Sequence, residues 1–213
     1  GAGGTDSLEV NCNMTTERLL EIAEGAVKLA AKERIDQAQA AAFVRGTALT
    51  RYANSQIHQN VASKAGGVVV KVVKNKRIGS LRINSLEDEQ VQKAVKTVVK
   101  IARVTPPNKD FKSLPQPQKW TPIRGVYDRE TAECSPDYRA QSVKEIIETA
   151  HSKSSKVRAV AGSLFTGSVA FAISNSLGVS AWAELSLASV ATTVISRAGD
   201  SQGYGSWEQH SRR

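Results

Sequence analysis

The sequence predicts an α+β fold, in which helices and antiparallel strands occupy different segments of the chain. Apolar residues recur at helical spacing in three segments, and strand-like runs fill the stretches between and after them. Five of the six prolines lie between residues 106 and 122, where they favour an extended crossing. We therefore expect an N-terminal α/β subdomain with antiparallel strands and two helices, then the Pro-rich crossing, and then a helix and an antiparallel β meander.

The boundaries of these parts follow from shifts in composition along the chain. The Gly-rich start is expected to be a disordered leader, and the Gly/Ser-rich end is expected to be a mobile tail. The predicted parts are the leader (1–15), the N-terminal α/β subdomain (16–104), the Pro-rich linker (105–134), the helix and β-meander subdomain (135–200) and the flexible tail (201–213).

Length and composition indicate a globular protein of the reducing cytoplasm. The 213 residues are 40% hydrophobic, which suffices for a sizeable core. No apolar run approaches the roughly 18 residues that a membrane span needs, so no membrane partner is expected. Cys12 and Cys134 lie far apart without a C-x-x-C pairing, which argues against a disulfide framework and a thiolate metal site.

The formal net charge of +9 raises the question of an acidic partner such as nucleic acid. Lysines and arginines are spread through residues 71–82, 93–103 and 153–158, and they are not interleaved with aromatic residues, which make up only 5% of the chain. We interpret most of these charges as solvated faces of helices and edge strands. Any DNA binding is therefore expected to be weak and independent of sequence.

The first half of the N-terminal subdomain predicts one helix and several strands. Residues 38–63 suit two or three strands with breaks at Arg45–Gly46 and Ala53–Asn54. Residues 68–83 predict a hairpin that turns at residues 74–76, with Gly79 at a bulge or a close backbone approach. Before them, residues 16–33 predict an amphipathic helix whose apolar stripe consists of Leu19, Ile22, Ala23, Ala26, Val27 and Ala30.

Two further helices are predicted from capping residues and apolar stripes. Ser85, with Asp88 three residues on, predicts the start of the second helix, which ends before Thr105. Ser135 and Pro136 predict the start of the third. The predicted stripes are Val91, Ala94, Val95, Val98, Val99 and Ala102 in the second helix, and Val143, Ile146, Ile147 and Ala150 in the third.

The C-terminal part predicts four antiparallel strands, over 157–165, 168–174, 179–186 and 187–197. The second and third are joined by the turn Asn-Ser-Leu-Gly at residues 175–178, because glycine adopts positive φ freely and asparagine tolerates it. In the third strand Trp182 lies on the polar face. We interpret it as partly buried under a neighbouring element, and the alternative is a contact surface for a partner or a missing domain.

The sequence predicts no catalytic, cofactor-binding or metal-binding residue. His58, His151 and His210 have no partner at the spacing that presents two ligands on one helix face, and no H-E-x-x-H is present. Cys134 lacks a flanking motif for a nucleophile. Gly203 and Gly205 resemble a phosphate loop only superficially, because no lysine-capped helix follows them.

The order of these elements resembles the TldD/PmbA family, known as modulators of DNA gyrase and grouped with the metallopeptidases. The likeness spans residues 16–205 and includes LTRYANSQIHQNVASKAGGVVVKVVKNKRIGSLRIN, IARVTPPNKDF and ISNSLGVSAWAE. Within these segments, the residues that match the family's pattern are Asn54, the glycine-led β stretch 67–82, the helix exit Ala102, Arg103 and Pro106, and the turn residues Asn175, Ser176 and Gly178.

The resemblance implies a cytoplasmic protein whose active relatives degrade unfolded peptides. In those relatives, zinc is held by an H-E-x-x-x-H motif and a cysteine in a following C-terminal domain. None of those ligands can be carried onto this sequence, and Cys134 precedes the β meander and does not match the C-terminal cysteine. We therefore expect the chain to be the N-terminal portion, with no cofactor of its own and no activity alone.

Three classes of function remain. The first is a non-catalytic scaffold and substrate-chamber region of a TldD/PmbA-type peptidase, which binds itself or a family partner chain and meets unfolded peptide within the assembly. The alternative is a basic module that binds nucleic acid or associates with gyrase, which the charge and the family's older name favour. A free-standing enzyme that uses Cys134 or a histidine ranks last. The candidate partner contact is Trp182.

Overall fold

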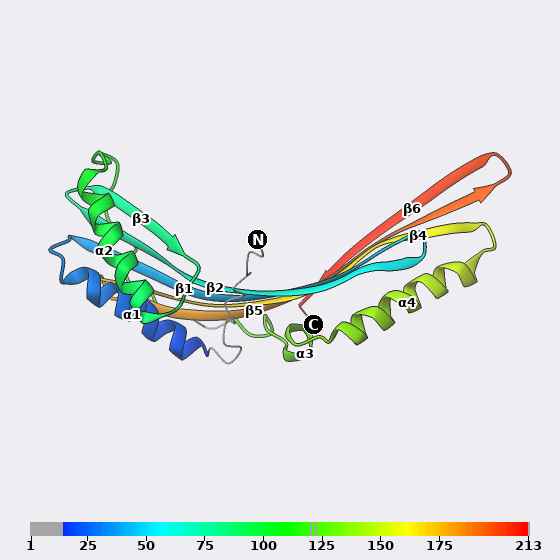
Figure 1. The fold of residues 1–213 in the computed structure, drawn as a ribbon, viewed down its shortest axis with the longest axis horizontal. Coiled ribbons are helices and arrows are strands. Elements are labelled where there is room, and N and C mark those ends of the chain that lie inside the picture. Colours follow the sequence, from blue (N-terminus) through cyan, green and yellow to red (C-terminus); the bar gives the residue numbers. More distant parts are fainter. Residues whose placement is uncertain (1–14, 120, 122, 213) are drawn as a thin grey trace, which may run out of the picture. The chain divides into compact units, whose positions relative to one another are not determined.

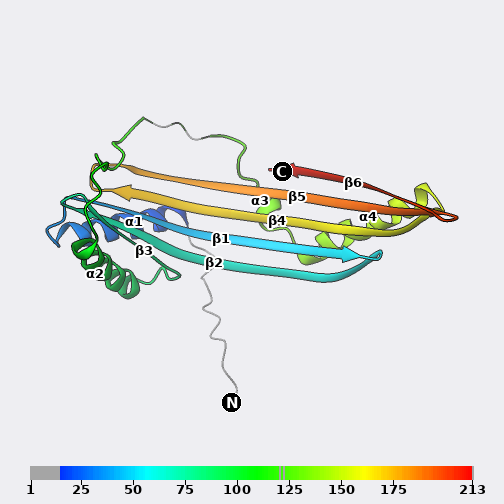
Figure 2. The same cartoon turned by 90° about the horizontal axis from the view of Figure 1, so that it is seen from above.

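The computed structural model describes residues 15–119, 121 and 123–212. Helices and antiparallel strands occupy different segments of it, which confirms the predicted α+β fold (Figure 1). The elements are α1 (Thr16–Ala31), β1 (Gln37–Ala53), β2 (Gln56–Lys74), β3 (Arg77–Ile83), α2 (Asp88–Val104), α3 (Arg129–Ala132), α4 (Pro136–Lys153), β4 (Val157–Asn175), β5 (Ser180–Ala198) and β6 (Ser201–Ser211). The six strands form one antiparallel sheet in the order β3-β2-β1-β4-β5-β6 (Figure 2).

The chain divides into two compact units, and each combines segments that are distant in sequence. Among the described residues, unit 1 consists of 15–44, 64–119, 121 and 170–183, and unit 2 consists of 45–63, 123–169 and 184–212. Strands β1, β2, β4 and β5 each contribute residues to both units. The structure therefore differs from the predicted consecutive subdomains, because long strands carry the chain from one unit into the other.

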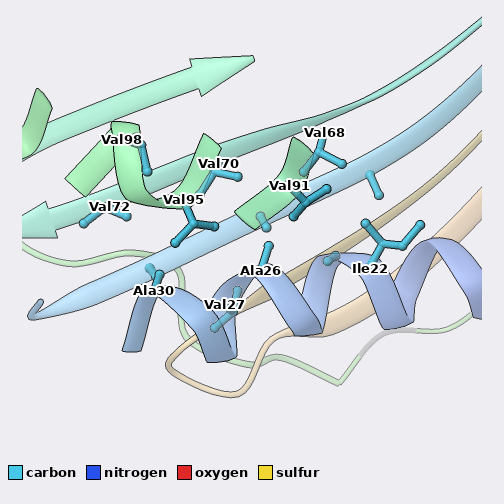
Figure 3. Close-up of a cluster of buried hydrophobic side chains, with 14 of the residues drawn as sticks. Ile22, Ala26, Val27, Ala30, Val68, Val70, Val72, Val91, Val95 and Val98 are labelled. Carbon is cyan, nitrogen blue, oxygen red and sulfur yellow. The ribbon is translucent and has the colours of Figure 1, made fainter. Parts of the chain in front are cut away.

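In unit 1, α1 and α2 cover one face of the strands. The predicted apolar stripes of both helices are buried against alternate residues of β1 and β2 (Figure 3). On β1 these residues are alanines, which take up little space beneath the helices, and on β2 they are larger valines. The strand residues in this core are Ala38, Ala40 and Ala42 of β1 and Val68, Val70 and Val72 of β2.

The helix starts follow capping side chains, with one correction. The Thr15 hydroxyl accepts a hydrogen bond from the Arg18 amide, and the Ser135 hydroxyl accepts one from the Tyr138 amide, as an N-cap does. The predicted cap at Ser85 is wrong, since α2 begins at Asp88. The Ser85 hydroxyl instead accepts from the amide of Glu87, at 3.1 Å, and so forms a local turn before the helix.

Two tight turns reverse the chain between β1 and β2 and between β2 and β3. Asn54 and Ser55 in the first, and Asn75 and Lys76 in the second, all have positive φ between 49° and 62°. Two consecutive residues of this conformation match a type I′ hairpin turn, which follows the twist of the flanking strands. The predicted hairpin is confirmed, whereas the predicted break at Gly46 is absent because β1 runs through it.

The C-terminal strands are longer and fewer than predicted. β4 runs through Thr166–Gly167, and β5 runs through Leu187, so the four predicted strands are two. A Cβ atom at Gly167 would lie 3.0 Å from the Gly46 carbonyl oxygen and 2.9 Å from the Phe165 ring. Glycine is needed there for close packing and not for a turn.

The predicted flexible tail at 201–213 is also corrected. Residues 201–211 form β6, which pairs with β5 from Ala188↔Ser211 to Ala198↔Ser201. Gly199, with φ of 60°, lies in the turn between them. Backbone pairing thus orders a Gly/Ser-rich segment whose composition alone indicates mobility.

In unit 2, α4 packs on one face of the strands. Val143 of α4 is buried against Tyr52 of β1 and Val160 of β4, and partly buried apolar residues complete the cluster: Ile146, Ile147, Ala150, Val157, Leu164 and Val194. The predicted stripe of the third helix therefore forms this contact. None of the helices in the described residues is both long enough and apolar enough to span a membrane.

Candidate functional site

Unit 2 has an apolar groove on the sheet face opposite α4. Tyr52, Val160 and Val194 contribute to the cluster with α4. Side chains alternate across a strand, so odd-numbered residues of the same strands point to the other face. There they line a groove of about 290 Å³, whose main side chains are Arg45 and Thr47 of β1, Phe165 and Val169 of β4, and Leu185 and Leu187 of β5.

The groove combines apolar walls with two cations. Arg45 is exposed at one side, Arg212 also lines the groove, and no carboxylate is among the lining residues. Leu187 remains 41% exposed although it is a large apolar side chain. Gly46 and Gly167 leave part of the groove lined by backbone. This arrangement suits an apolar group that carries a nearby negative charge.

Ser186, which lines the groove, is hydrogen-bonded to two other segments of the chain. It is only 2% exposed, and its amide donates to the Val126 carbonyl at 2.9 Å. Its hydroxyl accepts from the Asp128 amide and donates to the Arg212 carbonyl, both at 2.9 Å. Arg212 is therefore anchored by its backbone beside Leu185 and Leu187. The sequence analysis does not single out Ser186.

On the α4 side, a buried hydrogen-bond pair supports the strands that form the groove. The Tyr52 hydroxyl lies 2.6 Å from Thr192 Oγ1 and donates to the Ala191 carbonyl at 3.2 Å. Burial raises the pKa of Tyr52, and the bond with Thr192 partly offsets that rise. A Cβ at Gly162 would lie 2.6 Å from the Tyr52 hydroxyl, so glycine is required beneath it.

The guanidinium of Arg139, in the first turn of α4, is buried and donates hydrogen bonds to neutral groups. It is 1% exposed, and its Nη atoms donate to the Cys134 carbonyl at 2.6 Å and to Asn60 Oδ1 at 3.1 Å. Its Nε has no hydrogen-bond partner in the described part of the chain. Asn60 Oδ1 also accepts from the Thr50 hydroxyl, and Asn60 Nδ2 donates to the Pro136 carbonyl. Arg139 thus ties the start of α4 to β2.

One histidine contacts a serine hydroxyl. His151 Nε2 lies 2.8 Å from the Ser55 hydroxyl, which resembles a nucleophile and its base. The same hydroxyl, however, accepts from the Val160 amide at 3.1 Å, and the Ser55 amide donates to the Val160 carbonyl. Ser55 therefore organises the end of the β1–β2 hairpin, to which His151 tethers the last turn of α4.

The other residues considered for chemistry lie apart from one another. His58 is exposed, His210 lies 3.3 Å from the carboxylate of Glu208 at the surface, and Cys134 is partly exposed beside Ser135. Cys12 lies outside the described residues. Within 15–119, 121 and 123–212, no three His, Cys, Asp or Glu side chains converge as metal ligands. The described residues therefore do not fit the zinc that the resemblance implies for active relatives.

The turn at residues 175–178 anchors the Pro-rich crossing of unit 1. Asn175 Oδ1 accepts from the amides of Leu177 and Val179, and its Nδ2 donates to the Pro115 carbonyl at 2.8 Å. Ser176 bonds the backbone of Ala38 in both directions, through its amide and its hydroxyl. The turn residues that match the family's pattern therefore hold the Pro-rich crossing and β1 in place through hydrogen bonds.

Trp182 lies close to this turn, on β5. It keeps 39% of its surface exposed. The Ser180 hydroxyl donates to Glu24 of α1, so the even-numbered side chains of this part of β5 face the helices. A role of Trp182 as a partner contact stays a prediction.

Comparison with known proteins gives a match to one family model and a likeness of fold. Residues 46–102 match the profile of the PmbA/TldA metallopeptidase domain 1. No protein of curated function matches the sequence. Three solved structures are similar over most of this chain, at 18–20% identity, which is a likeness of fold.

The first of these structures is TldE from Thermococcus kodakarensis, with a TM-score of 0.83 and 20% identity, covering 89% of this chain and 43% of that one. The second is a candidate modulator of DNA gyrase from Bacteroides thetaiotaomicron, with a TM-score of 0.77 and 18% identity, covering 90% and 44%. A third, a candidate modulator of a DNA gyrase from Thermotoga maritima, has a TM-score of 0.76 and 19% identity, covering 90% and 43%.

The present chain thus spans less than half the length of the structures that it resembles. The profile match lies on β1, β2, β3 and most of α2, and the folds agree over a much larger part of the chain. On this evidence residues 46–102 are similar to domain 1 of the PmbA/TldA metallopeptidases, and the chain resembles the three solved structures in its fold.

Proposed function

We propose that this chain is the non-catalytic, substrate-holding region of a TldD/PmbA-type metallopeptidase and that its groove receives unfolded peptide. The apolar groove of unit 2 is the observation that carries the proposal. Folded proteins bury most of their large apolar side chains, whereas unfolded peptides expose theirs. A site that selects unfolded chains therefore needs an accessible apolar surface.

The lining residues suggest how such a peptide is held. Burial of an apolar side chain against Phe165, Leu185 and Leu187 contributes roughly 25 cal/mol per Å² of surface removed from water. Arg45 and Arg212 attract a carboxylate from an acidic side chain or from the peptide's C-terminus. Peptides that combine an apolar residue with a carboxylate should therefore bind best.

The chemistry of peptide cleavage belongs elsewhere in the proposed assembly. The zinc of active family members would come from another domain or from a partner chain, and a second copy or a family partner would close the chamber. The chain would then position peptides in the cytoplasm without cutting them.

Peptide binding by the groove can be measured directly. The probe is a fluorescein-labelled, unstructured hexapeptide with leucine next to a free C-terminal carboxylate, and the readout is fluorescence anisotropy. Leu187→Asp should weaken binding at least tenfold, because it places a charge in the apolar wall beside the site of the peptide's leucine. The matched control is Val104→Asp, which changes an exposed apolar residue, 81% accessible, at the end of α2 in unit 1.

Two results would overturn the proposal. One is the absence of saturable binding by the wild-type chain, and the other is equal affinity of the Leu187→Asp variant and the wild type. Amidation of the peptide's C-terminus should reduce affinity as well, by removing the charge that Arg45 and Arg212 attract.

A further inference from the structure

The two arginines of the groove extend from opposite margins of its apolar floor. Arg45 lies on β1 and Arg212 directly follows β6, and the strand order places β4 and β5 between them (Figure 2). Neighbouring strands are about 4.8 Å apart, so three strand spacings separate the backbones of the two arginines by roughly 14 Å. The two cations therefore attract anions from opposite sides of the groove.

Both guanidinium groups are accessible to a ligand. The side chains of Arg45 and Arg212 are exposed, and no carboxylate in the described part of the chain pairs with either of them. An arginine that has no acidic partner within its own protein can form charge-assisted hydrogen bonds with the carboxylate of a ligand. The groove can therefore accept two carboxylates at once.

The backbone holds the two cations at a set spacing. Arg45 lies within β1, and the carbonyl of Arg212 accepts a hydrogen bond at 2.9 Å from the buried Ser186 hydroxyl. Between them, the ring of Phe165 lies against Gly167, since a Cβ at Gly167 would lie 2.9 Å from a ring atom. The groove thus presents an aromatic floor between two cations whose backbones are fixed.

We propose that the groove selects extended peptides that carry two carboxylates about four residues apart, with an apolar side chain between them. An extended peptide rises about 3.3 Å per residue, so about four residues cover the roughly 14 Å between the two arginines. One carboxylate is the peptide's C-terminus, and the other is an acidic side chain. This inference rests on the proposed function and adds to it the spacing of the two charges.

Two isomeric peptides of equal charge test the spacing. Both are fluorescein-labelled heptapeptides with leucine at position 5, a free C-terminal carboxylate at position 7 and serine elsewhere. The first has glutamate at position 3 and glutamine at position 1, and in the second these two residues are exchanged. The second glutamate lies six residues from the C-terminus, or roughly 20 Å, which exceeds the gap. The first isomer should bind about fivefold tighter by fluorescence anisotropy, as expected for one additional exposed ion pair.

Arginine variants test which side chains read the spacing. Arg45→Gln and Arg212→Gln should each reduce the preference for the first isomer to less than twofold, because the spacing matters only when both cations are present. The matched control is Arg51→Gln, which removes an exposed cation from the same face of β1, six residues from Arg45 and outside the groove. It should keep the fivefold preference.

The outcomes separate this inference from the proposed function. Equal affinity of the two isomers for the wild type, or a preference that survives in both groove variants, would overturn the inference and leave peptide binding intact. Loss of the preference in Arg51→Gln would also overturn it, because overall charge would then explain the result. If neither isomer binds saturably, the proposed function fails and the inference fails with it.

Discussion

The side-chain amide of Asn175 donates a hydrogen bond to the backbone carbonyl of Pro115, 60 residues earlier in the chain, at 2.8 Å. The same side chain holds its own turn through Oδ1. One buried residue therefore joins the β4–β5 turn to the Pro-rich crossing of unit 1, and its two functions can be separated by substitution.

Asn175→Ala should destabilise the protein by about 2–3 kcal/mol, because three hydrogen bonds of roughly 1 kcal/mol each are lost. Asn175→Asp keeps the acceptor oxygen for the turn but loses the donor to Pro115. Hydrogen exchange at the amides of Leu177 and Val179 should accelerate in the alanine variant and remain slow in the aspartate variant. Equal acceleration in both would show that the turn depends on the contact with the crossing.

Tyr52 makes the stability of unit 2 sensitive to alkaline pH. Burial raises the pKa of its phenol, so the folded state holds the proton more tightly than the unfolded state does. The resulting stabilisation is complete below the unfolded pKa of about 10 and is lost as pH rises through the folded pKa. Urea unfolding should show this loss beginning near pH 10 and continuing at higher pH.

Tyr52→Phe provides the comparison for that experiment. It should cost about 1 kcal/mol at pH 8, where the bonds to Thr192 and Ala191 disappear. The difference between wild type and variant should shrink above pH 10. Burial also raises the pKa of the Tyr127 phenol, but both proteins contain Tyr127, so its contribution cancels in the difference. A difference in stability that stays constant across the pH range would therefore show that Tyr52 is not the source of the alkaline loss.

Gly79 is required because β3 approaches α2 closely. A Cβ there would lie 2.5 Å from the Val98 carbonyl oxygen and 2.8 Å from the Ala102 nitrogen, both backbone atoms. Gly79→Ala should therefore destabilise the fold by about 1–3 kcal/mol. Gly25→Ala is the matched control, since a Cβ in that position of α1 meets nothing within 4 Å. It should stabilise the helix by about 0.5–1 kcal/mol. Thermal unfolding measures both changes.

The buried guanidinium of Arg139 can be tested by two replacements. Arg139→Ala leaves a void and should cost about 2–4 kcal/mol. Arg139→Met fills most of that volume and removes a buried charge that only neutral groups solvate, so its cost should be within about 1 kcal/mol. If urea unfolding finds both variants equally unstable, the hydrogen bonds to Cys134 and Asn60 outweigh the burial of the charge.

DNA provides a check on the basic charge of the chain. A 20-base-pair duplex should bind weakly, with an affinity that falls steeply as salt rises and with no preference between sequences, because dispersed lysines and arginines neutralise phosphates without reading bases. Filter binding with two unrelated duplexes at several salt concentrations measures this. A sequence preference that persists at physiological salt would favour the nucleic-acid module instead.

The helices and the β2–β3 hairpin could be predicted because their signals are local. An apolar stripe, a capping serine and a two-residue turn such as Asn75–Lys76 act within a few residues. The α2 start was misplaced because Ser85 can satisfy a nearby amide in a turn as well as in a cap. Local hydrogen bonding does not distinguish these two cases.

The long strands and the groove depend on contacts that are distant in sequence. The sequence predicts breaks at Gly46 and Gly167, but each of them lies within a strand. Gly167 lies next to the carbonyl of Gly46, which is more than 100 residues away in the sequence. β6 is ordered by pairing with β5, which its composition does not reveal. Phe165 and Leu187 became candidate site residues only when the alternation of three neighbouring strands was known.

The sharing of β1, β2, β4 and β5 between the two units also sets the order in which the protein can fold during synthesis. Unit 1 needs residues 170–183, and unit 2 needs residues 184–211 to complete its sheet, so neither is finished when the first two-thirds of the chain has left the ribosome. The pairing of β1 with β4 closes a loop of more than 100 residues, and such distant contacts slow folding. Until then the apolar residues of β1 lack their neighbour β4, and the incomplete sheet would be a binding site for a chaperone that acts on nascent chains.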